Sequence, residues 1–214
     1  MIFHSLKKAK NKIDYQYDTY DEYKKSLSKS NHETLPYIMP TKIIAVGLNY
    51  HDHAEEMKKK PPKEPMIFLK SPSSLTSFNS TIFLPNHMSS KIDFEGELGI
   101  IIKKEAKWVE IKEAHKYILG GTCVNDVTAR DLQAIDIQFG RGKNFDTFCP
   151  VGPFVSDDID YQNLNIKTML NNKIKQNSNT SLMVHKIDFL ISFISKIMTL
   201  NRGEDRKSTR LNSS

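Results

Sequence analysis

The stretch Asp93-Phe94-Glu95-Gly96-Glu97-Leu98-Gly99-Ile100-Ile101-Ile102 decides the fold, because it joins a pair of carboxylates to an apolar strand. Apolar residues recur at every second position up to Ile102, which is typical of a strand with one buried face. The same period places Glu95 and Glu97 together on the other face. Two carboxylates on one face repel, so the arrangement favours a bound cation or a shared proton. An ordinary solvated strand face remains the alternative interpretation.

Length and composition indicate one compact domain with a small appendage. The 214 residues suffice to bury a substantial core. No apolar run is long enough for a membrane-spanning helix, and the amino terminus lacks the apolar core of a signal peptide. We therefore expect a cytoplasmic protein with no membrane partner.

The net charge of +6 does not by itself predict a nucleic-acid partner. Only five of the 31 basic residues are arginine, and the lysines are scattered or lie in tracts such as 58–60 with no aromatic residues beside them. We expect no nucleic-acid binding. The only cysteines, Cys123 and Cys149, are not spaced as a metal site and are too few for a disulfide framework, so we expect both to be reduced and buried.

Composition divides the chain into three segments. Residues 1–40 are polar and charged and are expected to form an amino-terminal appendage with one short helix at 20–27. Residues 41–204 carry all the motifs with recognisable chemistry and are expected to form the main domain. Residues 205–214 look like the translation of a sequencing-adapter oligonucleotide, and we expect this tail to be non-native.

Hydrophobic periodicity predicts the elements of the main domain. Strands are expected at 43–47, 66–70 and 118–126, helices at 51–57, 108–117, 127–138 and 187–200, and a hairpin at 165–176 that turns at Asn171-Asn172. Asp126 is expected to cap the helix that follows it, and this places Asp126, Arg130 and Gln133 on one helical face. Lys70 ends an apolar strand, and we favour a lysine that reaches solvent over one that faces the site.

Two further positions carry candidate chemistry. In a helix over 51–57, His53 and Glu56 stand at i and i+3, where the carboxylate would fix the imidazole tautomer and make it a better base. A solvated helical turn is the alternative interpretation. Lys143 lies in a loop rich in Gly, Pro and Phe, where partial desolvation would make it a fixed anion-binding charge.

Four motifs in this order resemble the fumarylacetoacetate hydrolase family. They are Gly47-Leu48-Asn49-Tyr50 with His53 and Glu56, then Asp93 to Leu98, then Asn125 to Asp131, then Lys143 with Phe145 to Phe148 and Pro150 to Pro153. The resemblance implies an α+β fold that is mainly β, a mixed β-sandwich roll with a few covering helices, and a homodimer. It also implies a Mg²⁺ or Mn²⁺ ion held by Glu95, Glu97 and Asp126, which agrees with the preference of hard cations for carboxylate oxygens.

The resemblance implies catalytic roles as well. His53 and Glu56 match the pair that activates water in the family, Lys143 matches its substrate-binding lysine, and Gln133 and Arg130 lie near the substrate. The implied reaction is hydrolytic carbon–carbon cleavage of a small 2-oxo acid of the acylpyruvate or fumarylpyruvate type. Isomerisation of a hydroxyheptadienedioate and decarboxylation of oxaloacetate remain open, because both use the same enolate chemistry without an attacking water.

The chain departs from the family at its carboxyl end. Family members continue past a Gly-Asp step into a Thr-Gly-Thr-Pro segment, whereas this chain has Gly203-Glu204 and then the tail. We therefore expect the domain at 41–204 to be incomplete, with exposed strand edges. A non-catalytic, metal-binding remnant is the alternative to an enzyme.

Overall fold

The computed structural model describes residues 3–6, 14–17, 40–56, 58, 60–153 and 155–202. The predicted helix at 20–27 and the tail at 205–214 lie outside these residues. In the described part of the chain, none of the helices is long and apolar enough to cross a membrane.

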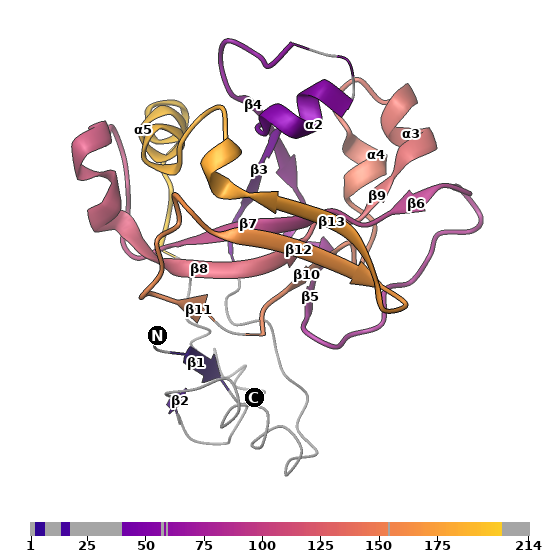
Figure 1. Cartoon of the computed structure of the whole chain (residues 1–214), viewed down its shortest axis with the longest axis horizontal. Helices are drawn as coiled ribbons and strands as arrows, with labels where there is room; N and C mark the ends of the chain where they lie inside the picture. Colours follow the sequence, from indigo (N-terminus) through magenta and orange to yellow (C-terminus); the bar gives the residue numbers. More distant parts are fainter. Residues whose placement is uncertain are drawn as a thin grey trace, which may run out of the picture.

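The fold is rich in strands and has few helices (Figure 1), which confirms the predicted mainly β class. The strands are β1 (Phe3–Leu6), β2 (Asp14–Tyr17), β3 (Ile43–Gly47), β4 (Met66–Lys70), β5 (Leu75–Ser77), β6 (Ile92–Asp93), β7 (Gly96–Ile102), β8 (Ile118–Asn125), β9 (Thr128–Ala129), β10 (Cys149–Val151), β11 (Val155–Ser156), β12 (Asn165–Leu170) and β13 (Lys173–Asn179). The α-helices are α2 (His51–Glu56), α3 (Arg130–Ile135), α4 (Gly140–Lys143) and α5 (Ile187–Ile197). The described residues also form the 3-10 helices η1 (Pro72–Ser74), η2 (Ile111–Tyr117) and η3 (Thr180–Leu182).

Strand β8 is the centre of a seven-stranded sheet. It pairs antiparallel with β7, β10 and β11; β5 extends the sheet beyond β10, and β1 and β2 extend it beyond β11. Three further ribbons of two strands each are β3–β4, β6–β9 and β12–β13. Because Gly96 pairs with Asn125, the start of β7 lies beside the end of β8. This register positions the candidate site.

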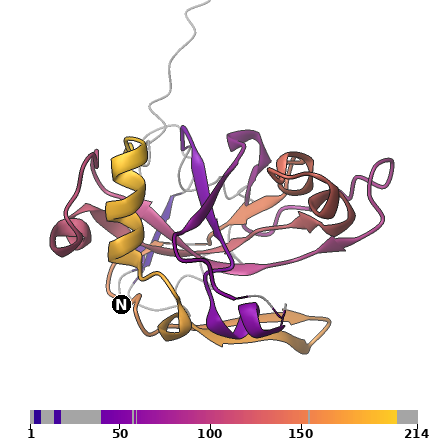
Figure 2. The same cartoon turned by 90° about the horizontal axis from the view of Figure 1, so that it is seen from above.

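The main hydrophobic core lies between α5 and β7 (Figures 1 and 2). Ile187, Ile191 and Ile194 recur at i, i+4 and i+7 on α5 and are buried, as expected for an amphipathic helix. The alternate apolar residues of β7, from Leu98 to Ile102, pack against them. One face of the strand thus packs on the core, but the predicted one-sided burial is wrong, because the buried residue of β7 is Ile101, which alternates with these residues.

The helix predicted over 127–138 is wrong at both ends, because α3 spans only Arg130–Ile135. Val127 and Thr128 are β-branched or apolar residues that are buried in an extended segment, and Thr128 in β9 pairs with Asp93 in β6. The helix α3 therefore begins only at Arg130, so Asp126 does not share its face. Arg130 and Gln133 remain neighbours at i and i+3.

Three other expectations need correction. The covering helix predicted at 108–117 is the 3-10 helix η2, although it still packs against α5. The loop predicted around Lys143 contains the short helix α4. Cys149 is buried and Cys123 is exposed, because alternate side chains of β8 point to opposite faces and Thr122 takes the buried position. Both cysteines are free, as predicted.

The Asn171-Asn172 turn of the β12–β13 hairpin is confirmed and yields a first testable prediction. Its two residues have φ of 50° and 61°, in the left-handed region that a β-branched side chain adopts at a cost. We expect Asn172→Val to lower the free energy of unfolding by about 1 kcal/mol. Urea denaturation measures the change, and Asn172→Gly, which suits this φ, is the matched control. Equal stability of the valine variant and the wild type would contradict the prediction.

Candidate functional site

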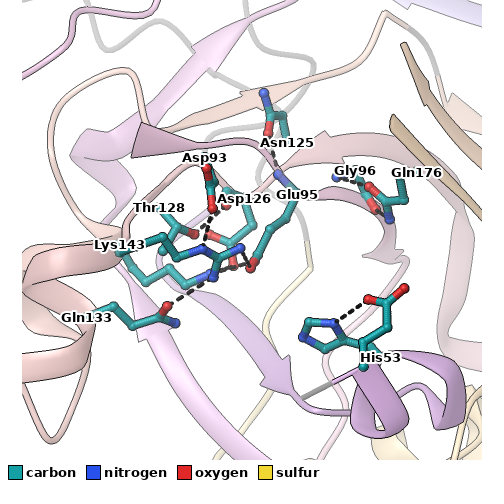
Figure 3. Close-up of polar contacts among 12 residues, drawn as sticks. His53, Asp93, Glu95, Gly96, Asn125, Asp126, Thr128, Gln133, Lys143 and Gln176 are labelled. Carbon is teal, nitrogen blue, oxygen red and sulfur yellow. Dashed lines mark hydrogen bonds and ion pairs between the residues drawn. The ribbon is translucent and has the colours of Figure 1, made fainter. Parts of the chain in front are cut away.

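The β7–β8 pairing brings the three predicted carboxylates to one end of the sheet. Glu95 precedes β7, Glu97 lies in it, and Asp126 directly follows β8. The backbone N–H of Asp126 donates to the Glu95 carbonyl at 2.8 Å, and the Asn125 side chain accepts from the Glu95 N–H at 3.1 Å (Figure 3). Backbone pairing thus brings together carboxylates that lie about thirty residues apart in the sequence.

An ammonium group lies between two of these carboxylates. The Lys143 Nζ is 2.6 Å from Glu95 Oε2 and 2.7 Å from Asp126 Oδ2, and the residue is only 2% exposed (Figure 3). The helix α4 carries Lys143 into this position by packing closely on α3. A Cβ on Gly142 would lie 2.9 Å from the Gln133 backbone nitrogen, so the approach needs glycine. The predicted anion-binding lysine therefore binds anions of the protein itself.

Lys70 also faces the site, and the prediction that it reaches solvent is wrong. Its residue is 2% exposed, its Nζ is 2.6 Å from Asp126 Oδ1, and it donates a 2.5 Å hydrogen bond to the Lys143 carbonyl. The Asp126 Oδ1 atom has no hydrogen-bond partner among the described residues, and its contact with Lys70 is an ion pair. Pairing with Asp126 compensates the burial that a lone lysine would not tolerate.

Arg130 completes what we call the charge chain, the sequence of contacts Arg130–Glu95–Lys143–Asp126–Lys70. Its guanidinium is 2.7 Å from Glu95 Oε1, bonds Asp93 at 2.8 Å, and donates to the Gln133 side chain at 3.0 Å. Each carboxylate of the chain thus contacts two cations. This hydrogen bond holds Gln133 beside Arg130, and the predicted contact of Gln133 with a substrate stays a prediction.

Glu97 lies beside the charge chain but outside it. Its carboxylate makes no hydrogen bond or ion pair with any residue that the structure describes. Burial, together with the nearby charges of Glu95 and Asp126, raises the pKa of Glu97 to about 8, although Lys143 lowers it. Glu97 is therefore the one predicted carboxylate ligand that pairs with no cation among the described residues.

The three carboxyl groups at this end of the sheet fit a hard divalent cation in their donor chemistry. Within the described ranges, however, no three His, Cys, Asp or Glu side chains are arranged to hold a metal ion. In this arrangement the Lys143 ammonium takes the position between Glu95 and Asp126. Metal ligation by Glu95, Glu97 and Asp126 therefore stays a prediction, and Lys143 would have to give way.

The candidate base lies on α2, apart from the charge chain (Figure 3). His53 Nδ1 is 3.8 Å from Glu56 Oε2, and their side chains are 44% and 80% exposed. The structure thus brings the predicted pair together, at a distance longer than a hydrogen bond. Water can reach both groups, and their catalytic role stays a prediction.

One cavity of about 980 Å³ joins these groups. Its lining includes His53, Glu56, Glu97, Gln133 and all five members of the charge chain. Tyr50 also lines it, and its hydroxyl is buried without a hydrogen-bond partner among the described residues. Burial, then Glu97 and Asp52, raise the pKa of Tyr50. The sequence names Tyr50 only as the last residue of the Gly47–Tyr50 motif; its place just before α2 is the signal that could have found it.

The comparisons with known proteins point in one direction. Residues 42–204 match the profile of a family described as fumarylacetoacetate (FAA) hydrolase C-terminal. An uncharacterized protein of Archaeoglobus fulgidus is 44% identical over 192 residues, which are 90% of this chain and 76% of that protein. The mitochondrial oxaloacetate tautomerase fahd2 of Xenopus laevis is 42% identical over 184 residues, which are 83% of this chain and 57% of the tautomerase. The solved structure of 5-carboxymethyl-2-hydroxymuconate delta-isomerase from Mycobacterium smegmatis has a TM-score of 0.77 and 34% identity, covering 95% of this chain and 84% of the isomerase.

Proposed function

Because this chain belongs to the fumarylacetoacetate hydrolase family, we propose that it is an enzyme that enolises a small 2-oxo dicarboxylic acid. The reaction would be a tautomerisation or isomerisation of an oxaloacetate-like substrate. The charge chain beside Glu97, in the cavity that His53 also lines, is the observation that carries this proposal. The similar proteins named as a tautomerase and an isomerase favour it over the carbon–carbon hydrolysis predicted from the sequence.

The cationic residues give the cavity its preference for acids. Arg130 and Lys143 present a guanidinium and an ammonium to a cavity of the size that small-molecule sites have. A dicarboxylate would compete with Glu95 and Asp126 for these cations. Arg130 would bind one carboxylate through its planar fork of donors, and Lys143 would stabilise charge that develops on the oxo oxygen.

A divalent cation would complete the site. Held by Glu95, Glu97 and Asp126, Mg²⁺ or Mn²⁺ would supply Lewis-acid stabilisation of the negative charge that enolisation creates. A side chain of the protein would then transfer the proton that enolisation requires. His53 would take a proton from the carbon beside the oxo group and return one to the enol, while Glu56 orients its ring.

Hydrolysis of an acylpyruvate is the second candidate. The 3.8 Å separation of His53 and Glu56 and their exposure favour it, because a water molecule can reach the imidazole. In that reaction His53 would deprotonate water for attack on the distal carbonyl instead of moving a substrate proton.

One assay separates the two candidates. The protein with Mn²⁺ is given the enol form of oxaloacetate, an acylpyruvate and a hydroxylated dienedioate, and absorbance follows each conversion. We expect the fastest reaction to be a tautomerisation or isomerisation, with no carbon–carbon bond broken. Faster cleavage of the acylpyruvate would replace the proposal by the hydrolase, and no turnover of any of the three would favour the non-catalytic remnant.

A further inference from the structure

A glutamine from the β12–β13 hairpin holds the backbone between the two candidate ligands of β7. The Gln176 side-chain amide donates to the Gly96 carbonyl at 2.7 Å, and its oxygen accepts from the Gly96 N–H at 2.9 Å (Figure 3). On its other edge β7 is paired with β8, where Gly96 faces Asn125. Gln176 therefore acts as one residue of an additional strand, and it fixes the peptide that joins Glu95 to Glu97.

The fit around Gly96 is close and specific. A Cβ at this position would collide with the Thr168 hydroxyl and lie 3.2 Å from Gln176 Oε1. The same Thr168 hydroxyl donates to Gln176 Oε1 at 2.9 Å, which holds the amide in the orientation that Gly96 requires. Glycine in the Glu-Gly-Glu segment is thus explained by this approach of the hairpin.

The hairpin is itself tied to the helix of the candidate base. Ser178 follows Gln176 by two residues on β13, so both side chains lie on the same face. The Ser178 hydroxyl donates to Asp52 Oδ2 at 2.6 Å, and Asp52 Oδ1 accepts from the His53 backbone N–H at 2.8 Å. One face of β13 thus contacts the carboxylate segment and the base helix together.

We propose that Gln176 is a positioning residue for the cation site, acting through the Gly96 backbone on Glu95 and Glu97. This rests on the proposed function in one respect, namely that these carboxylates bind a divalent cation. Gln176 would not touch the cation or the substrate. Loss of its two hydrogen bonds would free the Glu95–Glu97 segment on one edge and lower the fraction of molecules in which both carboxylates converge.

The test uses Gln176→Met, which keeps the length of the side chain and removes both hydrogen bonds. Calorimetry on the full chain should give a Mn²⁺ affinity about tenfold or more below that of the wild type, as for other residues that orient metal ligands. Amide hydrogen exchange, followed by NMR, should become faster at Gly96. Lys173→Met, at the exposed start of β13, is the matched control and should change neither quantity.

A second, milder variant keeps the test decisive if Gln176→Met does not fold. Thr168→Val removes only the hydrogen bond to Gln176 Oε1, and we expect a smaller loss of Mn²⁺ affinity in the same direction. Unchanged Mn²⁺ affinity despite faster Gly96 exchange would overturn the proposal, and so would unchanged exchange in Gln176→Met. A wild-type protein that binds no Mn²⁺ would contradict the proposed function instead, and the exchange at Gly96 alone would then decide whether Gln176 holds the strand.

Discussion

Replacing Lys143 by methionine is expected to lower the free energy of unfolding of the cation-free protein by about 3 kcal/mol, the lower end of the cost of removing one partner from a buried ion pair. The Lys143 ammonium lies between Glu95 and Asp126, and its side chain is 3% exposed. The loss leaves two carboxylates closer to repulsion, although Arg130 and Lys70 still compensate part of their charge. Urea denaturation at neutral pH measures the change.

Adding Mn²⁺ extends this experiment to the cation site. If the ammonium and the cation compete for one position, Mn²⁺ should raise the stability of Lys143→Met more than that of the wild type. Lys116→Met is the control, because Lys116 pairs with Glu113 on an exposed surface and its loss should have no measurable effect. Equal stability of Lys143→Met and the wild type without Mn²⁺ would show that the charge chain does not stabilise the fold.

Replacing His53 by alanine is expected to lower kcat by a factor of about 100 to 10,000, the contribution of a positioned acid–base group. Mn²⁺ affinity should stay unchanged, because His53 lies on α2, apart from the three carboxylates (Figure 3). Steady-state kinetics with the best substrate of the proposed assay gives kcat, and calorimetry gives the affinity.

The same helix provides the control for His53. His51 is exposed at the start of α2 and does not line the cavity, so His51→Ala should keep wild-type turnover. Full activity of His53→Ala would remove His53 as the proton-transferring group in both candidate reactions. A fall in Mn²⁺ affinity together with kcat would instead place His53 among the groups that shape the cation site.

Patterns of a few residues were enough for much of the fold. The strand β7, the helical spacing on α5 and the Asn171-Asn172 turn each depend on contacts within a short segment, and all three elements are confirmed, although the burial of β7 is not one-sided. The family could also be predicted, because its motifs are short and keep their order along the chain. The helix predicted over Val127–Ala129 is wrong, because local helix propensity does not register the pairing of β9 with β6. That pairing imposes an extended backbone on this segment.

The polar contacts of the site join residues that are far apart in the sequence, so only the tertiary structure shows them. Glu95, Glu97 and Asp126 could be named from the sequence, but nothing local shows that Lys143 takes the place between two of them or that Lys70 faces inward. Gln176 was not predicted at all, since its partner Gly96 lies 80 residues away and the contact exists only where the hairpin lies along β7. Periodicity along the chain reveals which side chains share a face. The pairing of charges across elements is decided by packing, because a buried ammonium or carboxylate is stabilised by a counter-charge that only the completed fold brings near.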